Sequence, residues 1–229
     1  MRFPRPIHAV LFDMDGILLD TETIYTEVTQ DYVAQWGKTF DWSIKSHMVG
    51  RPAIEAATYL VEALDLPISP ADYLADREEH LLERMGSAKA LPGAEELTRA
   101  LHEAGVPIAV ATSSPRKFFE RKTGHHAAWF SLFDAIITGD DSRIGKGKPA
   151  PDIFLLAAAA IEADPTKALV IEDSPAGVTA GAAAGAQTLA VPHTGMDRGK
   201  LEHADLIVDS LTEIDLGALG LTDTPAPDA

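Results

Sequence analysis

The chain has 229 residues, of which 46% are hydrophobic, and it carries a net charge of −16 with an isoelectric point near 4.7. This acidity argues against a nucleic-acid ligand, which requires a basic surface, and against binding to anionic membranes. There is no cysteine, which excludes disulfides, thiolate catalysis and zinc–thiolate sites. No apolar run approaches the roughly 18 residues of a membrane span. Residues 1–6 leave no room for the apolar core of a signal peptide, so we expect a cytoplasmic protein.

The first feature along the chain is an apolar run over residues 7–12, which ends at Asp13, Asp15 and Gly16. A short apolar run closed by a turn signal is typical of a buried strand. Residues two apart on a strand point to the same side, so both carboxylates would project together from its end. A bound cation would relieve their repulsion, and Mg²⁺ prefers such oxygen ligands. The alternative is that the two aspartates only begin an Asp-Gly turn.

The next segment has the spacing of helices. Apolar residues recur at about every fourth position over residues 24–36, and further helices are expected to begin at Pro52 and after Ser69. A polar loop is expected over residues 38–51. The pattern over residues 21–87 therefore predicts an all-helical insertion without a strand.

From Leu91 onward the pattern alternates between helices and strands, which indicates an α/β fold with a parallel sheet and helices on both faces. The strands expected in this part of the chain cover residues 106–111, 135–138, 168–171, 187–191 and 206–208. Residues 222–229 are interpreted as a disordered tail.

Four of the predicted strands end in polar side chains. These pairs are Asp13 and Asp15, Thr112 and Ser113, Asp140 and Asp141, and Glu172 and Asp173. Ligands of parallel sheets bind beyond the carboxyl ends of the strands. Four polar pairs at one edge therefore predict a functional site there.

These side chains suit phosphoryl transfer, which depends mainly on positioning and on charge neutralisation. Asp13 would be the nucleophile, and Asp15 would transfer protons to the leaving group and from water. Thr112 and Ser113 would bind phosphate oxygens, assisted by backbone N–H groups at the start of the following helix. Lys148 would bring positive charge to the phosphoryl group.

Asp173 and Glu172 would complete the Mg²⁺ shell with Asp13 and Asp15. Each residue also has a purely structural interpretation. Thr112 could be a turn residue, Lys148 a solvated lysine, and Glu172 and Asp173 could serve only as negative charge at a helix N-terminus. Lys146 is assigned to solvent.

Two further patterns are given structural interpretations. Gly177, Gly181 and Gly185 recur at every fourth residue, which we interpret as close packing of a helix on the sheet. The pair His125-His126 has no third ligand nearby in the sequence, so we assign no metal site to it.

Taken together, these motifs resemble the haloacid dehalogenase superfamily of phosphatases and phosphomutases. Asp13-Met14-Asp15-Gly16 resembles its first motif, Thr112 its second, Lys148 its third and Glu172-Asp173 its fourth. The helical insertion is similar to the family's α-helical cap. The chain is most similar to the branch of pseudouridine-5′-phosphatases and glycerol-3-phosphatases, with β-phosphoglucomutase as the next neighbour.

The resemblance implies a Rossmann-like core of residues 1–20 and 88–229 with a cap of residues 21–87. It implies that Asp13 is the nucleophile, that Asp15 is the acid/base, and that Mg²⁺ is held by the Asp13 carboxylate, the Asp15 carbonyl and Asp173, with support from Glu172. Tyr25 stands where phosphomutases of this type carry a histidine, which favours a phosphatase.

We therefore expect a Mg²⁺-dependent phosphatase that hydrolyses a small phosphomonoester through an aspartyl-phosphate. The substrate would be a sugar, polyol or nucleoside monophosphate, such as pseudouridine 5′-phosphate or glycerol 3-phosphate. Arg51 and His47 in the cap are candidates for substrate specificity. The alternatives are a phosphomutase and a non-catalytic module that binds phosphorylated metabolites. A monomer or a small homo-oligomer is expected.

Overall fold

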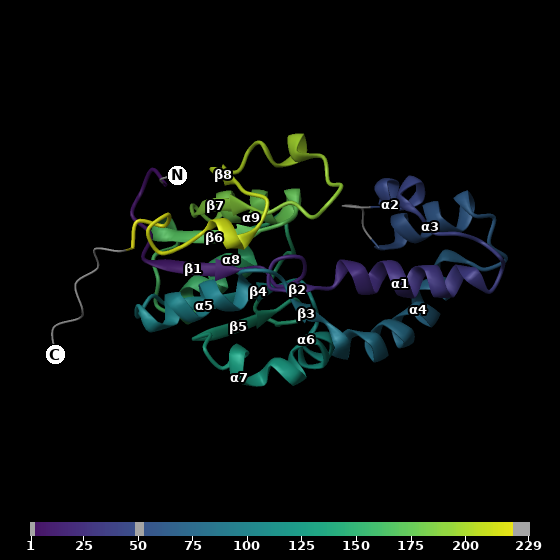
Figure 1. The fold of residues 1–229 in the computed structure, drawn as a ribbon, viewed down its shortest axis with the longest axis horizontal. Coiled ribbons are helices and arrows are strands. Elements are labelled where there is room, and N and C mark those ends of the chain that lie inside the picture. Colours follow the sequence, from purple (N-terminus) through teal and green to yellow (C-terminus); the bar gives the residue numbers. More distant parts are fainter. Residues whose placement is uncertain (1–2, 49–52, 222–229) are drawn as a thin grey trace.

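The computed structural model describes residues 3–48 and 53–221. A six-stranded, all-parallel sheet forms its centre, with the strand order β5-β4-β1-β6-β7-β8 (Figure 1). The strands are β1 (Ala9–Phe12), β4 (Ile108–Thr112), β5 (Ala135–Thr138), β6 (Ala168–Glu172), β7 (Gln187–Ala190) and β8 (Leu206–Ile207). The α/β fold predicted from the alternating pattern is confirmed, with strand ends shifted by one or two residues.

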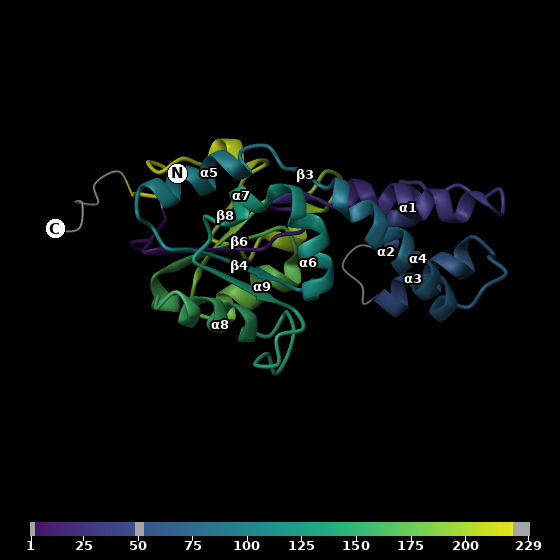
Figure 2. The same cartoon turned by 90° about the horizontal axis from the view of Figure 1, so that it is seen from below.

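Helices cover both faces of this sheet because alternate strand residues point to opposite sides. Val10 and Phe12 pack into one core, and Ala9 and Leu11 into the other. The first core lies under α5 (Ala94–Glu103), α6 (Arg116–Thr123) and α7 (Ala127–Phe130), and the second under α8 (Asp152–Ala160) and α9 (Pro175–Ala183). Figure 2 shows these two groups on opposite sides of the sheet.

Four helices lie beside the sheet and pack around a hydrophobic core of their own, which includes Tyr32, Leu60 and Tyr73 (Figure 1). They are α1 (Glu22–Ala34), α2 (Trp42–Met48), α3 (Ala53–Ala63) and α4 (Pro70–Arg84). Two short strands, β2 (Leu19–Asp20) and β3 (Lys89–Ala90), pair antiparallel where this segment leaves and rejoins the rest of the chain. Within the described ranges, no helix has the length and apolar character needed to cross a bilayer.

The prediction of a polar loop over residues 38–51 is wrong for the middle of this range, where α2 forms. The side chain of Asp41 accepts hydrogen bonds from the backbone N–H and the hydroxyl of Ser43, which fixes the start of this helix. Ile44 and Met48, four residues apart, then pack on the helical core. Two apolar contacts are too few to give a helical pattern in the sequence. The predicted tail at 222–229 lies outside the described residues.

Gly177 and Gly181 allow close packing of α9 on β6 and β7, as predicted from their spacing, whereas Gly185 lies after the end of the helix with a φ of +85°. A Cβ atom on Gly181 would lie 2.9 Å from the Cβ of Val170 and 3.0 Å from the Cγ2 of Thr188. A Cβ atom on Gly177 would lie 1.7 Å from Oε1 of Glu172. These glycines therefore set how near α9 lies to the carboxyl ends of the strands.

We expect the substitution Gly181→Ala to destabilise the protein by about 1–3 kcal/mol, because the added methyl group overpacks the contact with Val170. Gly124→Ala is the matched control, since no atom lies within 4 Å of the position of its added Cβ, and alanine favours helical backbone. Urea unfolding of both variants tests this. Equal stabilities would contradict the packing assigned to Gly181.

Candidate active site

The candidate site lies at the carboxyl end of β1, between β4 and β6. The order of strands reverses at β1, because β4 and β5 lie on one side of it and β6 to β8 on the other. Such a switch point opens a crevice beyond the strand ends, where parallel α/β sheets bind their ligands. Asp13 follows directly after β1, so it is placed at the centre of this crevice.

The buried ammonium group of Lys148 connects the carboxyl ends of β1 and β6. Its Nζ lies 2.5 Å from Oδ1 of Asp13 and 2.6 Å from Oε1 of Glu172, and it donates a third hydrogen bond to the carbonyl of Ala111. Burial alone would lower the pKa of Lys148, but the two carboxylates outweigh this and raise it. The lysine is therefore held charged beside Asp13.

Glu172 is a buried anchor whose two carboxylate oxygens both have partners. Oε1 accepts from Lys148, while Oε2 accepts from the backbone N–H groups of Asp173 and Ser174 and from the hydroxyl of Ser174. Ser174 in turn accepts a hydrogen bond from Gly177 and caps α9. Glu172 therefore ties the start of α9 to Lys148.

Among the described residues, Asp173 has no comparable set of donors. Burial raises its pKa well above the usual range, with further repulsion from Glu172 and Asp13. Its carboxylate presses against Gly16, where an added Cβ would lie 2.2 Å from Oδ2 of Asp173. Gly16 also has a φ of +84°, which glycine adopts without strain. The glycine after Asp15 thus makes room for Asp173.

The geometry of this acidic group suits a metal ion. Oxygen atoms of Asp13, Glu172 and Asp173 lie within 4.8 Å of one another. Burial raises the pKa of Asp13 to about 7 even with Lys148 beside it, and Glu172 and Asp15 repel its charge further. The single positive charge of Lys148 does not balance the negative charges of these three carboxylates when they are ionised. Oxygen ligands of this kind suit a hard divalent cation. The residues present therefore fit the predicted magnesium site.

The carboxylate of Asp15 is directed to a different set of partners. Its Oδ1 lies 2.5 Å from Nζ of Lys122, and its Oδ2 accepts hydrogen bonds from Ser114, at 2.8 Å, and from Thr112, at 3.3 Å. Burial raises the pKa of Asp15, but the charge and hydrogen bond of Lys122, together with Ser114, outweigh this and lower it. Asp13 and Asp15 therefore sit in opposite electrostatic surroundings, although one residue separates them.

A cavity of about 430 Å³ opens over these groups. The predicted site residues that line it are Asp13, Asp15, Ser113, Lys148, Glu172 and Asp173. The hydroxyl of Thr112 is fully buried and engaged with Asp15 and with the N–H of Ser114, so a role in binding phosphate stays a prediction. The helical segment contributes Glu22 and Tyr25 to the wall.

The pair at the end of β5, which was expected at the same edge, is engaged elsewhere. Asp140 accepts hydrogen bonds from Arg116 and Thr138, and Asp141 pairs with Arg143. Neither aspartate lines the cavity over Asp13. Three of the four polar strand ends therefore meet, and the fourth stabilises local loops.

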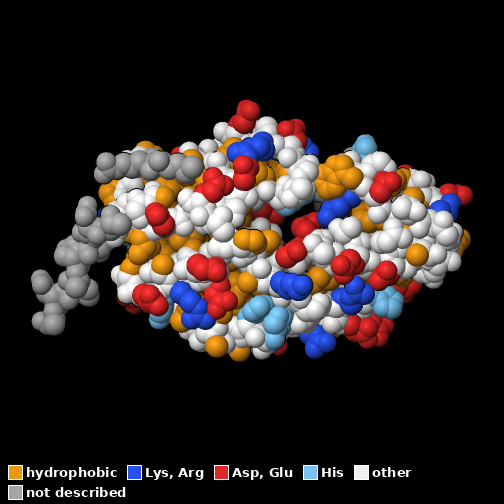
Figure 3. Space-filling view, viewed as in Figure 1, with side chains coloured by type: hydrophobic (Ala, Val, Ile, Leu, Met, Phe, Trp, Pro, Cys, Tyr) orange, Lys and Arg blue, Asp and Glu red, His pale blue; other side chains and the backbone are white. Residues whose placement is uncertain are grey.

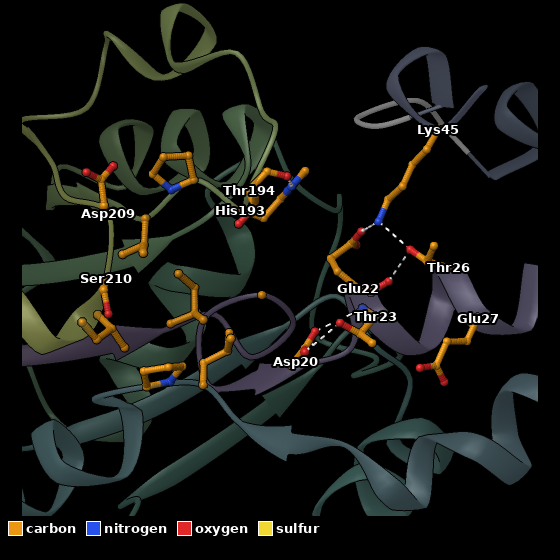
Figure 4. Close-up of a pocket in the computed structure, with 17 residues that line it drawn as sticks. Asp20, Glu22, Thr23, Thr26, Glu27, Lys45, His193, Thr194, Asp209 and Ser210 are labelled. Carbon is orange, nitrogen blue, oxygen red and sulfur yellow. Dashed lines mark hydrogen bonds and ion pairs between the residues drawn. The ribbon is translucent and has the colours of Figure 1, made fainter. Parts of the chain in front are cut away.

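A second cavity of about 540 Å³ lies beside the first and shares Glu22 and His193 with it. In the space-filling view, a hollow with acidic and basic side chains at its rim separates the sheet region from α1–α4 (Figure 3). Figure 4 shows Lys45 reaching from α2 to Glu22, at 3.0 Å, and to the hydroxyl of Thr26, at 2.7 Å. The charge of Glu22 is thus already paired.

Of the two cap residues predicted for specificity, His47 is described. Its ring stacks on Tyr59 and its Nδ1 lies 2.9 Å from the carbonyl of Ser43. Arg51 lies outside the described residues. Lys45 of α2 lines the second cavity, and it was not singled out from the sequence.

Lys122 and Ser114 are the other functional candidates that sequence reasoning missed. Lys122 lies three residues after the buried Phe119, on the inward face of α6, and this position was the available signal. Lys146 is exposed, as predicted. His125 and His126 both direct Nε2 at the carbonyl of Ala88, so their contact is structural.

Comparison with known proteins agrees with this geometry. The model of the haloacid dehalogenase-like hydrolases matches residues 7–185. The chain belongs to this family.

Several relatives are similar over most of this chain. It is 43% identical over 209 residues to (DL)-glycerol-3-phosphatase 1, mitochondrial, of Arabidopsis thaliana, covering 89% of this chain and 70% of that protein. It is 40% identical over 220 residues to a protein of Drosophila melanogaster named probable pseudouridine-5′-phosphatase, covering 95% of each. A crystal structure of a family hydrolase from Deinococcus radiodurans with bound phosphate and sodium is 30% identical, with a TM-score of 0.81, covering 96% of this chain and 99% of that one.

The charge imbalance around Asp173 predicts a stability effect. With a chelator present, we expect Asp173→Asn to raise the free energy of unfolding at pH 8 by on the order of 1–2 kcal/mol, because a repelled buried charge is removed. The gain should shrink at pH 5. The raised pKa of Asp173 means that its destabilising contribution grows as pH rises above the unfolded-state pKa, and is absent below that value, where the carboxyl is protonated in both states.

Asp141→Asn is the control for this measurement, because Asp141 pairs with Arg143 at the surface and its pKa is lowered to about 2. It should not stabilise the protein at either pH. Urea unfolding of the three proteins at both pH values makes the comparison. An Asp173→Asn variant no more stable than wild type at pH 8 would contradict the electrostatic account.

Proposed function

We propose that this chain is a phosphatase that hydrolyses a small phosphomonoester through an aspartyl-phosphate on Asp13. The supporting observation is the Asp13 carboxylate at the strand switch point, held 2.5 Å from the buried ammonium of Lys148 and open to a cavity. Relatives over 89% and 95% of this chain are named as a glycerol-3-phosphatase and a probable pseudouridine-5′-phosphatase. A polyol or nucleoside monophosphate is therefore the proposed substrate class.

Mg²⁺ is the proposed cofactor. Asp13 and Asp173 would hold it through their carboxylates and Asp15 through its carbonyl, while Glu172, whose oxygens already have donors, would support Asp173. When bound, the ion would supply positive charge that offsets the negative charge of the phosphoryl oxygens.

The residues of this chain would carry the chemistry in two steps. In the first, an oxygen of Asp13 attacks phosphorus while the bond to the leaving oxygen breaks, and Asp15 gives that oxygen its proton. In the second, Asp15 takes a proton from a water molecule, which attacks phosphorus and releases Asp13. Lys148 stabilises the charge on the transferring group in both steps.

The proposal also assigns a role to each of the two parts of the chain, a core and a cap. Residues 21–87 would act as a cap over a core formed by residues 1–20 and 88–229, and close the cavity over the substrate. Arg51 and His47 stay proposed specificity residues of that cap. We propose that the enzyme works in the cytoplasm as a monomer or small homo-oligomer.

A phosphomutase is the alternative, and Tyr25 is the residue that bears on it. Tyr25 lines the cavity beside Asp15, and burial and that carboxylate raise its pKa. A phenol held in its protonated form would not exchange protons as a histidine would. We therefore favour transfer to water. Release of phosphate from glucose phosphates, without interconversion of isomers, would agree with this choice.

The substitution Asp13→Asn should lower phosphatase activity by about 10³-fold or more, because the amide does not replace a carboxylate nucleophile. Activity is measured as phosphate released from a panel of phosphorylated metabolites with Mg²⁺, and a chelator should abolish it. Asp141→Asn, which removes an aspartate outside the cavity, should leave the rate within about twofold. Full activity of Asp13→Asn, or no turnover by wild type on any substrate, would refute the proposal.

A further inference from the structure

Lys122 is a lysine in the interior of the protein. Its side chain comes from α6, has no exposed surface, and does not line the cavity over Asp13. A buried ammonium group destabilises a folded protein unless it is paired and hydrogen-bonded. An apolar side chain at this position would avoid that cost, so the fold alone gives no reason for a lysine here.

The contacts of Lys122 form a closed triangle around Asp15. Nζ lies 2.5 Å from Oδ1 of Asp15 and 2.7 Å from Oγ of Ser114, and that hydroxyl donates in turn to Oδ2 of Asp15 at 2.8 Å. Both oxygens of one carboxylate are thus held by two side chains that also hold each other. The side chain of Asp15 remains 26% exposed on its cavity side.

We propose that Lys122, with Ser114, is a positioning residue that fixes the carboxyl group of Asp15 for proton transfer. The inference rests on the phosphatase function proposed above. Lys122 does not touch the substrate, because Asp15 and Ser114 lie between it and the cavity. It acts by limiting the orientations of a short side chain whose rotation would carry it away from the leaving oxygen.

The proposed role of Lys122 predicts different effects on substrates whose leaving group needs a proton and on substrates whose leaving group does not. When the P–O bond of an alkyl phosphate breaks, the alkoxide oxygen must receive a proton from Asp15. When the bond of 4-nitrophenyl phosphate breaks, the phenolate leaves without a proton. Since kcat/KM covers events up to the transfer of the phosphoryl group to Asp13, a misplaced Asp15 slows the first substrate much more than the second.

The test compares Lys122→Met with wild type on glycerol 3-phosphate and on 4-nitrophenyl phosphate. We expect kcat/KM for glycerol 3-phosphate to fall by about 10- to 100-fold, the effect of misplacing a catalytic group by about 1 Å. For 4-nitrophenyl phosphate the fall should be below about threefold. Lys117→Met, on the same helix but exposed and paired with Glu78, should change neither value.

Equal losses on both substrates would overturn the inference, because a merely structural lysine affects both alike. No loss on either would also overturn it. If Lys122→Met does not fold, as judged by thermal melting, Ser114→Ala is tested by the same ratio and should give a smaller loss of the same selectivity. If wild type hydrolyses another alkyl phosphate of the metabolite panel better than glycerol 3-phosphate, that ester takes its place in the ratio. If wild type hydrolyses no phosphomonoester of the panel, the proposed function itself fails, which is a separate result from any ratio between variants.

Discussion

Three carboxylates, two of them buried and that of Asp173 half-buried, crowd around one ammonium group, and the strand ends and α9 hold this arrangement in place. Lys148 holds Asp13 and Glu172, while Asp173 lies against Gly16 and forms no ion pair within the described part of the chain. With all three carboxylates ionised, the group would carry roughly two excess negative charges, and their repulsion and burial raise the pKa values of Asp13 and Asp173. A divalent cation would remove that excess, which links the folded structure to the proposed chemistry.

The sheet and α9 make this crowding possible. The reversal of strand order at β1 brings Asp13 beside the ends of β4 and β6. Gly16 and Gly177 then allow side chains to approach where a methyl group would collide with Asp173 or Glu172. A second lysine, Lys122, compensates Asp15 separately. Without a metal ion, the pKa of Asp13 is raised and that of Asp15 is lowered, and a cation bound by Asp13 would favour the ionised carboxylate that a nucleophile requires.

The parts of the fold that sequence predicted are those with strong local signals. Strands buried on both faces are continuous apolar runs, and their polar ends mark the crevice. Helix α2 was missed because Ile44 and Met48 alone pack it on the helical core, and its polar contacts, such as that of Lys45 with Glu22, leave no periodic pattern in the sequence. The pairing of β2 with β3 was missed because it involves two residues from each strand. Lys122 looks like an ordinary helix lysine in the sequence, since its partner Asp15 lies 107 residues away along the chain.

Calorimetric titration of Mg²⁺ into the metal-free protein is the most direct test of the proposed magnesium site at Asp13 and Asp173. We expect one ion to bind per chain of wild type and Asp173→Asn to bind at least about tenfold more weakly, since a carboxylate ligand becomes a neutral amide. Asp141→Asn, whose changed side chain lies outside the acidic group, should bind as wild type does. Equal affinity of wild type and Asp173→Asn, or no binding at millimolar Mg²⁺, would contradict the central claim.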